Sequence, residues 1–499
     1  MRTETNSDRQ GAESEDSAKA GQFIRAMSLT DATMLVAGSM IGSGIFIVAA
    51  DISRTMGSPF WLIMAWVVAG VLTLLGALAY GELAAMYPRA GGQYVFLRES
   101  MGPLMGFLYG WTLFVVIQTG TIAAVAVAFG RFLGVLWPDI SPERFGWFPQ
   151  FNWVNSSGTI ELGLSPQRLV ALITIWILTW INLRGVKEGK LVQTTLTVVK
   201  TVALAMLILL GLVVGRNALA VGANFGPGEF FRTGSFTGPF VIAFGTALVG
   251  SLFSSDAWNN VTFAAAEVKD SSRNLPRALL YGTGLVTVLY ILANFSYLNV
   301  LPLEGVANGA TVLERGIQHA TQDRVGTAAA EIIFGPVGAT IMAVAILIST
   351  FGCNNGLILA GARVYYAMAR DGLFFKAAGT LSANHVPARA LVVQAIWTSA
   401  LCLTGTYSQL LDYVVFAALL FYVLTTVGLF VLRVKKPELE RPYRAIGYPF
   451  LPAFYIALAS SVCVILLIAE KTQTQALSGL VLVGLGIPVF YLWRRVARS

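Results

Sequence analysis

Charged residues are scarce in this sequence. Asp, Glu, Lys and Arg make up only 12% of its 499 residues, whereas 56% are hydrophobic. A soluble protein carries roughly 25% charged residues, which cover its cores with a hydrated surface. The composition therefore excludes a water-soluble fold and indicates a membrane protein, in agreement with the mean hydropathy of +0.69.

Histidine and cysteine are rare as well. The chain has two histidines, His319 and His385, and three cysteines in apolar stretches, Cys353, Cys402 and Cys463. No C-x-x-C or Cys/His spacing occurs, so we expect no disulfide, no metal site and no cofactor. Without an H-E-x-x-H motif, and with so few histidines for a catalytic dyad, the sequence also argues against an enzyme.

The first 26 residues are polar, carry both signs of charge and contain no apolar run. This composition predicts a disordered tail over residues 1–26 and not a signal peptide.

Long apolar runs make up most of the remaining chain. Each has 18 or more residues and can cross the ~30 Å hydrocarbon layer as a helix. They predict an all-α membrane protein with twelve transmembrane helices. The expected spans are 29–52, 59–87, 94–132, 166–184, 191–214, 237–266, 275–301, 334–369, 388–406, 408–432, 448–469 and 475–493.

Basic residues are distributed unevenly between these spans. With the N-terminus inside, the inner segments hold 24 Lys and Arg and the outer segments hold nine. Cytoplasmic loops retain positive charge, so we expect both termini in the cytoplasm. The membrane that we expect to hold the chain is the plasma (inner) membrane. The net charge of +8 then lies beside membrane lipid, and we expect no nucleic-acid partner.

Two spans carry sequences that interrupt a helix. The first contains GSMIGSGIF at 38–46, with three glycines in seven residues, and the sixth contains FSSDAWNN at 253–260. Close packing through small residues is an alternative explanation for the first of them. However, interrupted helices at matching positions, five spans apart, point to a transporter built from two inverted repeats.

The interruptions offer both signs of partial charge. A break in the first span leaves N–H groups at Ser43, Gly44 and Ile45, which suit a carboxylate. Free carbonyls at Ser39, Met40 and Phe253 suit an ammonium, so the site fits an α-amino acid. The residues that we expect at the substrate site are Met40, Ile41, Ser43, Gly44, Ile45, Phe253, Asp256, Asn259 and Asn355.

For three of these residues the sequence also allows a role other than substrate binding. Asp256 either interacts with the substrate ammonium or a proton, or it caps the half-helix that begins near Trp258. For Asn259 and Asn355 the alternative to a cavity position is an interhelical hydrogen bond.

Lys200 lies about ten residues, ~15 Å, inside the fifth span. An insertion cost of roughly 2.5–3.5 kcal/mol implies a partner or a function for it. The carbonyls of the interrupted first span are the expected partners, either for structure alone or for coupling. Closer to the inner surface, Arg363 and Arg370 are expected to be cytoplasmic anchors, and Glu82 and Arg89 to form part of an inner gate.

Four separated motifs occur in order along the chain: GSMIGSGIF at 38–46, GELAAMYPRAGG at 81–92, AAAEVK at 264–269 and NLPR at 274–277. They resemble those of the amino acid–polyamine–organocation superfamily, and within it the L-amino-acid transporter (light-subunit) subfamily. The resemblance runs from about residue 28 to 440.

This resemblance implies an inverted five-plus-five helix core, two extra C-terminal helices and alternating access. The corresponding domains are residues 27–215, 237–433 and 448–493, followed by a cytoplasmic C-terminus at 494–499. It places the substrate between spans one, three, six, eight and ten.

The resemblance also implies roles for single residues. Positions matching Ser43 and Gly44 bind the substrate carboxylate, and those matching Met40, Phe253 and Asp256 surround the amino group, with the Phe253 aromatic as a gate. The lysine matching Lys200 replaces an ion of sodium-coupled relatives, which implies sodium independence.

The chain departs from the family at two points. Asp256 stands where several animal members have glycine, which leaves the accepted side chains open. The segment 133–165 lacks the cysteine through which animal light subunits bond a glycoprotein, so no disulfide-linked partner is expected.

The predicted function is therefore secondary transport of neutral L-amino acids without sodium. The alternatives are a proton-coupled symporter of cationic amino acids or polyamines, and a non-transporting amino acid sensor on the same fold.

Overall fold

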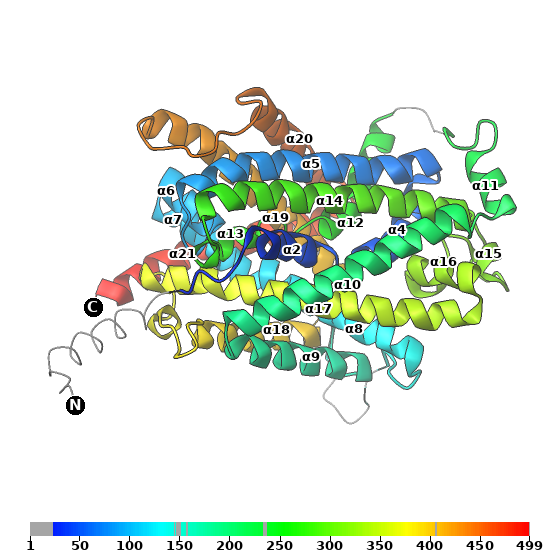
Figure 1. Ribbon diagram of the computed structural model, residues 1–499, viewed down its shortest axis with the longest axis horizontal. Coiled ribbons are helices and arrows are strands. Elements are labelled where there is room, and N and C mark those ends of the chain that lie inside the picture. The colour runs from blue at the N-terminus through cyan, green and yellow to red at the C-terminus, as the bar shows by residue number, and fades with distance from the viewer. Residues whose placement is uncertain are drawn as a thin grey trace, which may run out of the picture.

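The computed structural model describes residues 23–143, 145, 151–155, 158–232, 237–404 and 407–498. Long helices lie side by side along the longest dimension of the molecule (Figure 1). Within the described residues, ten helices are long and apolar enough to cross a membrane. The chain is therefore an integral membrane protein of helical architecture, as the composition predicts.

The first half of the chain contains eleven helical segments and one hairpin among its described residues. The helices are α2 (Leu29–Met40), α3 (Gly44–Ile47), α4 (Ala49–Met56), α5 (Pro59–Met86), α6 (Gln93–Met101), α7 (Pro103–Thr112), a π-helical turn η1 (Leu113–Ile117), α8 (Gln118–Leu136), α9 (Pro166–Leu183), α10 (Val186–Val213) and α11 (Ala218–Phe225). The strands β1 (Phe151–Asn155) and β2 (Gly158–Leu162) form an antiparallel pair.

Every secondary-structure element in the described part of the second half is a helix. Its elements are α12 (Gly238–Ser254), α13 (Asn260–Phe263), η2 (Ala265–Glu267), α14 (Ser271–Val300), α15 (Val312–Arg315), η3 (Thr321–Asp323), α16 (Val325–Phe334), α17 (Pro336–Arg370), η4 (Lys376–Gly379), α18 (Ala388–Thr404), α19 (Tyr407–Lys435), α20 (Phe450–Ile468) and α21 (Gln473–Arg498).

Two of the twelve expected spans fall short of a full-length membrane helix. The span predicted at 237–266 is interrupted after α12, and the span predicted at 388–406 corresponds to the shorter helix α18. Helices of this length still fit the membrane class when neighbouring helices cover their ends.

The chain leaves the helical conformation at both predicted interruptions. In the first span, α2 starts at a capping box made by Ser28 and Asp31 and ends at Met40, and the helix resumes at Gly44. In the sixth, α12 ends at Ser254 and α13 starts at Asn260, with Ala257 in the left-handed region at φ 64°. Such backbone is tolerated at membrane depth only where protein or a cavity satisfies it.

The third predicted span, 94–132, differs from the structure. Gly102 separates α6 from α7 with a φ of +97°, a conformation that favours glycine, and Pro103 starts the new helix. A π-helical turn follows within the second piece. One expected helix is therefore two helices, the longer of which contains an irregular turn.

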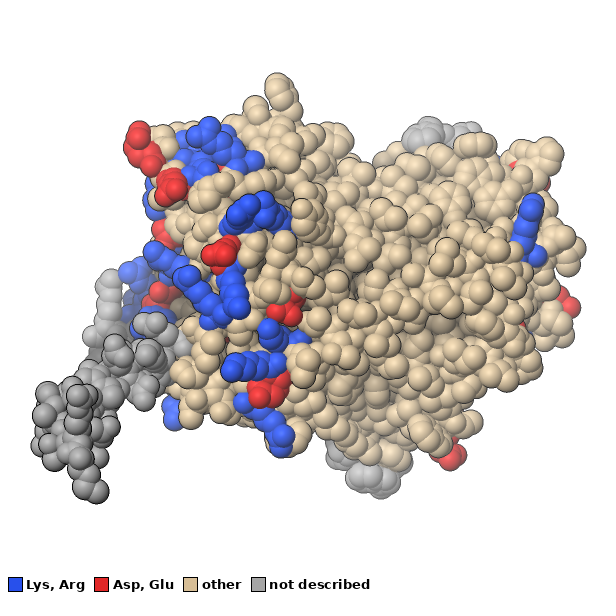
Figure 2. Space-filling model, viewed as in Figure 1, with Lys and Arg blue, Asp and Glu red and all other residues tan. Residues whose placement is uncertain are grey.

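Lys and Arg gather at one end of the molecule, which we call the basic end (Figure 2). At this end Glu82 accepts hydrogen bonds from Arg433 at 3.0 and 2.6 Å and from the Ala445 amide at 2.7 Å. Asp371 forms an ion pair with Arg98. These bonds join α5, α6, α17 and α19 where the helices leave the apolar layer.

Residues just before α2 also pack against the basic end. Met27 pairs with Val268 in a parallel bridge, and its N–H donates to Glu267 O at 2.9 Å. Lys190 Nζ donates to Ala26 O at 2.7 Å, and the Phe23 ring contacts Tyr366. Of the expected tail at 1–26, Phe23 and Ala26 therefore contact the helices, whereas Ile24 and Arg25 are exposed and 1–22 lie outside the described residues.

The opposite end is covered by the segment between α14 and α16. Arg54 on α4 donates to Gln318 O at 2.6 Å and pairs with Asp323 at 2.7 Å. Arg131 on α8 donates to Gln322 O. Gln322 and Asp323 both adopt left-handed backbone, with φ of 52° and 59°. This turn therefore holds α4 and α8 together across that end.

Candidate substrate site

The two helix interruptions meet in the core of the protein. A Cβ on Gly44 would collide with the Ser254 side chain, so α3 approaches the end of α12 closely. Tyr290 on α14 spans both breaks: its hydroxyl lies 2.9 Å from Met40 O and 3.2 Å from Ser254 O. The glycine at 44 thus permits the contact between the two interrupted helices.

Lys200 is fully enclosed beside the first interruption. Its ammonium donates to Gly38 O at 2.6 Å, Ile41 O at 2.7 Å and Ser349 O at 3.3 Å. Three N–H groups thus meet three carbonyls, which satisfies a charge that is 1% exposed. The sequence predicted these partners in the first span, and α17 supplies the third.

The carbonyls expected to be free for a substrate ammonium have partners. Ser39 O accepts from the Cys353 thiol at 3.0 Å, Met40 O accepts from Tyr290, and Phe253 O accepts from the Asp256 amide at 3.1 Å. That prediction is wrong for this conformation, because the folds of α12, α14 and α17 bring donors to the breaks.

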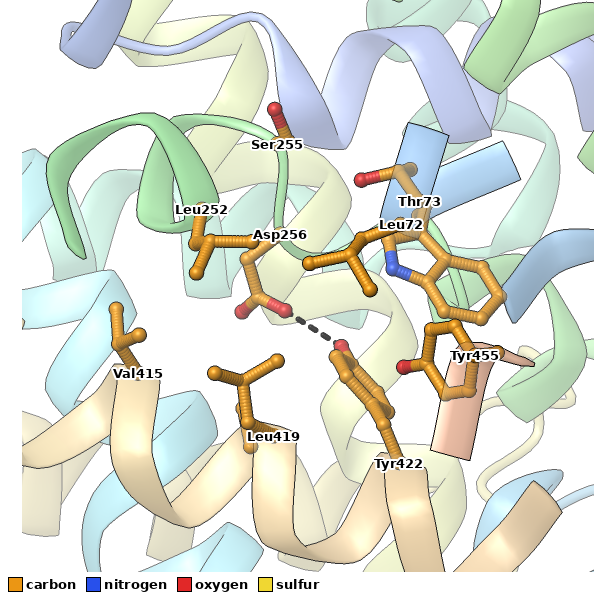
Figure 3. A pocket seen from close by; sticks show the side chains of 11 residues that line it. Leu72, Thr73, Leu252, Ser255, Asp256, Val415, Leu419, Tyr422 and Tyr455 are labelled. Atoms are coloured by element: carbon orange, nitrogen blue, oxygen red, sulfur yellow. Dashed lines mark hydrogen bonds between the residues drawn. The ribbon is translucent and has the colours of Figure 1, made fainter. Parts of the chain in front are cut away.

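Asp256 lies in the second interruption and faces α19. Its Oδ1 accepts from the Tyr422 hydroxyl at 2.5 Å, and the carboxylate points into a cavity beside that ring (Figure 3). The half-helix α13 has Asn259 at its N-cap and no side-chain capping bond. Asp256 is therefore not the N-cap of α13, but its carboxylate accepts a local hydrogen bond from the Ala257 backbone as well as lining the cavity.

Asn259 connects the hydrogen-bonded pair of Asp256 and Tyr422 to α6. It donates to Gln93 Oε1 at 2.7 Å, and Gln93 in turn donates to Thr425 Oγ1 at 3.0 Å. Tyr422 also lies 3.3 Å from Asn259 Oδ1. Asn259 thus makes interhelical bonds and lines a cavity, so both of its predicted positions occur together.

Two small cavities lie on either side of Asp256, and both are lined by Asp256, Ala418 and Tyr422. The first lies among α5, α12, α19 and α20, and the second among α7, α8, α13 and α17. The centre of a water molecule can occupy about 20 Å3 of the first and about 10 Å3 of the second. This is room for about one water molecule each, so surrounding helices must move apart to admit an amino acid.

The other predicted substrate residues lie outside these two cavities. The buried residues of the first interruption pack against α12, α14 and α17; they are Met40, Ile41, Ser43, Gly44 and Ile45. Phe253 is also buried, at 7% exposure, one residue away from the lining residue Leu252.

Asn355 takes the interhelical position. Its amide donates to Gly189 O at 3.0 Å and Gln193 Oε1 at 3.1 Å, and its oxygen accepts from Asn182 at 2.9 Å. These contacts join α17 to α9 and α10, away from Asp256.

Arg363 is not a surface anchor. It is 1% exposed and binds Glu267, with Nε 2.9 Å from Oε1, whereas Arg370 on the same helix is exposed. The prediction for Arg363 is therefore wrong, because Glu267 of η2 provides a charge partner inside the protein. Arg89 lines a larger cavity at the basic end, of about 420 Å3.

Sequence reasoning missed four residues that organise this centre: Gln93, Tyr290, Ser349 and Tyr422. Ser349 donates to Ile41 O at 3.1 Å, and the other three are described above. Tyr290, Ser349 and Tyr422 are polar side chains inside apolar spans, which is the signal that could have identified them; Gln93 lies just before the span expected at 94–132 and gives no such signal.

Known proteins resemble this chain over most of its length. The amino acid permease family model matches residues 27–488. The human "Large neutral amino acids transporter small subunit 2" is 31% identical over 97% of this chain and 84% of its own length. The "Serine/threonine exchanger SteT" of Bacillus subtilis (strain 168) is 31% identical over 94% and 96%, respectively. The "b(0,+)-type amino acid transporter 1" of Oryctolagus cuniculus is 30% identical over 86% and 80%. An integral membrane protein with two interrupted helices around a buried polar centre, matched in this way, belongs to the amino acid permease family.

Proposed function

We propose that this permease exchanges neutral L-amino acids across the plasma membrane by alternating access and without sodium. The observation that carries the sodium independence is the position of Lys200. Its ammonium binds carbonyls of the first interruption and of α17, so a fixed protein cation already supplies positive charge there. Relatives named for large neutral amino acids and for serine/threonine exchange favour neutral substrates.

The architecture that supports this cycle consists of two inverted five-helix halves, 27–215 and 237–433, with 448–493 as two additional helices. The matching interruptions in α2–α3 and α12–α13 favour this division. The concentration of Lys and Arg at the basic end favours a cytoplasmic location of that end and of both termini. No disulfide-linked glycoprotein partner is included, because the segment 133–165 has no cysteine.

Within this scheme, Ser43, Gly44 and Ile45 present the first N–H groups of α3 to the substrate carboxylate once α3 and α12 separate. The amides of Gly44 and Ile45 lie in the first turn of α3, where a helix offers no intrahelical acceptor for its N–H groups. The Asp256 carboxylate binds the amino group, the side chains of Met40 and Phe253 lie beside it while their carbonyls stay bonded to Tyr290 and the Asp256 amide, and Asn259 faces the substrate side chain. We leave Asn355 out of the substrate contacts because three neighbours use its side chain.

A second candidate follows from Asp256. Its carboxylate faces a cavity whose other walls include Trp258 and Tyr455, an environment that also suits a cationic side chain. Proton-coupled symport of cationic amino acids or polyamines is therefore the alternative substrate class.

The test is uptake of labelled leucine, serine and lysine into proteoliposomes that contain the purified protein. We expect internal neutral amino acid to stimulate uptake of leucine or serine, and replacement of sodium by choline to leave the rate unchanged. Protein-free liposomes are the control. A sensor would bind amino acids without uptake, and a clear sodium dependence would contradict the role assigned to Lys200.

Asp256→Asn distinguishes a substrate or proton role from a structural one. Asparagine can accept the Tyr422 hydrogen bond but carries no charge and binds no proton at its oxygen. We expect a KM increase of about tenfold, because a charge-assisted contact contributes about 1.5–3 kcal/mol. Uptake measured from about pH 5 to 8 in both proteins provides the readout. Asn355→Asp is not used as a control, because it would bury a new charge. Superimposable profiles and equal KM values would leave recognition to the backbone alone.

A further inference from the structure

The wall of the second cavity contains an irregular helical turn. Leu113–Ile117 form the π-helical turn η1 between α7 and α8, and the Gln118 N–H bonds Leu113 O, five residues earlier. Five residues of this helix line the cavity, namely Gln118 and four that are spaced by four with the turn between them: Tyr109, Leu113, Ile117 and Thr121. Turns of this type occur mostly as single turns inside α-helices, and frequently at functional sites.

The spacing explains what the wide turn does. In a regular α-helix, residues four apart rotate by ~40° at each step, because each residue turns the helix by ~100°. Four such residues would spread over ~120°. A wider turn between Leu113 and Ile117 reduces this rotation, so that all four side chains face one cavity.

A wide turn displaces carbonyls from regular helical bonding, and two side chains bind them here. Thr119 Oγ1 donates to Phe114 O at 2.6 Å. Trp397 on α18 donates from its indole Nε1 to Val115 O at 3.0 Å. Its ring also stacks on Phe114 with centroids 6.2 Å apart. Trp397 is 37% exposed on the outside of the helices, where hydrocarbon offers no replacement donor.

We propose that Trp397 is a positioning residue for substrate selection: it holds the π-helical turn in place and thereby sets the room for the substrate side chain. Trp397 does not line the cavity, so it acts through Val115 and the turn. This inference rests on the proposed function, in which the cavity beside Asp256 and Asn259 receives that side chain.

Trp397→Phe tests the inference because phenylalanine keeps an aromatic ring against Phe114 but has no N–H. Without the Trp397 hydrogen bond, the π-helical turn would relax toward a regular α-helix. The four lining residues would then point in more divergent directions, and a large side chain among them would turn into the cavity. We expect the ratio of the leucine KM to the alanine KM to rise about fivefold, the equivalent of one hydrogen bond of about 1 kcal/mol. The matched control is Trp176→Phe, another exposed tryptophan, on α9.

Both KM values are measured in proteoliposomes alongside the parent protein. If the parent transports neither amino acid, the proposed function fails. If it transports both and the KM ratio of Trp397→Phe equals that of the parent, the role of Trp397 is refuted, also when kcat falls equally for both substrates. Should Trp397→Phe not fold, Thr119→Val removes the other bond to the same turn and is expected to raise the same ratio; an unchanged ratio there refutes the proposal.

Discussion

Lys200→Ala is expected to remove most transport, by at least about tenfold, while the protein stays folded and retains measurable substrate binding. The ammonium ties the first interruption to α17 through Gly38, Ile41 and Ser349. Losing these charge-assisted bonds, at about 1.5–3 kcal/mol for one such bond, shifts the equilibrium between conformers in which α2 and α17 are differently arranged. Initial uptake rates and substrate-induced thermal stabilisation measure the two quantities separately.

The control for this change is Lys187→Ala, which removes an exposed lysine from the same helix. It is expected to transport at the parent rate. Parent-like transport in Lys200→Ala would show that the buried ammonium only fills space between α10 and the first interruption.

Arg363→Met is expected to cause the largest loss of stability among the charged residues discussed here. The change leaves Glu267 as a buried carboxylate without its guanidinium, and both side chains are 1% exposed. Removing one member of such a pair costs about 3–5 kcal/mol. Thermal unfolding in detergent should therefore show a clear drop in Tm.

Two further variants show whether the unpaired charge causes the drop in Tm. Arg370→Met removes an exposed arginine from the end of the same helix and should leave Tm unchanged. Arg363→Met combined with Glu267→Gln removes both charges and should recover much of the lost stability. A double variant as unstable as Arg363→Met would show that packing of the arginine side chain, and not the unpaired charge, governs this position.

The local sequence was sufficient to predict that the protein spans a membrane and where two of its helices are interrupted. Apolar runs identify long helices because hydrocarbon forces every backbone group into an internal hydrogen bond. The glycines at 38–44 and the polar residues at 254–260 weaken the helix where they stand, so the breaks were predictable without knowledge of the fold. A lysine ten residues inside a span requires nearby acceptors for the same reason.

Partners distant in sequence were not predictable in this way. Asn355 could face a cavity or another helix, and only the packing of α17 on α9 and α10 shows the latter. The position of Arg363 near a helix end suggested water or headgroups, but Glu267 lies 96 residues earlier and meets it in the interior. The carbonyls of the first interruption were also assigned as free because their donors come from α14 and α17.

The helix that lines the second cavity contains one irregularity that the sequence predicts and one that it does not. Gly102 and Pro103 mark the split between α6 and α7 in the sequence, and this signal was available. The π-helical turn at Leu113–Ile117 has no such marker, since its residues are ordinary apolar ones. It depends on donors supplied by Thr119 and by Trp397 of another helix.

The turn at the end opposite the basic end gives the protein a sensitivity to ionic strength. Gln322 and Asp323 are consecutive non-glycine residues in left-handed backbone, and each such residue costs about 1–3 kcal/mol. Arg54 and Arg131 offset this cost through bonds to the same turn, and the Arg54–Asp323 pair is about one-third exposed. Because the Debye length falls from about 10 Å at 0.1 M to about 3 Å at 1 M, salt near 1 M weakens the exposed Arg54–Asp323 pair while the strain of the turn stays constant. High salt therefore favours release of this end, and the rate at which it opens should rise with ionic strength even when no ion is transported.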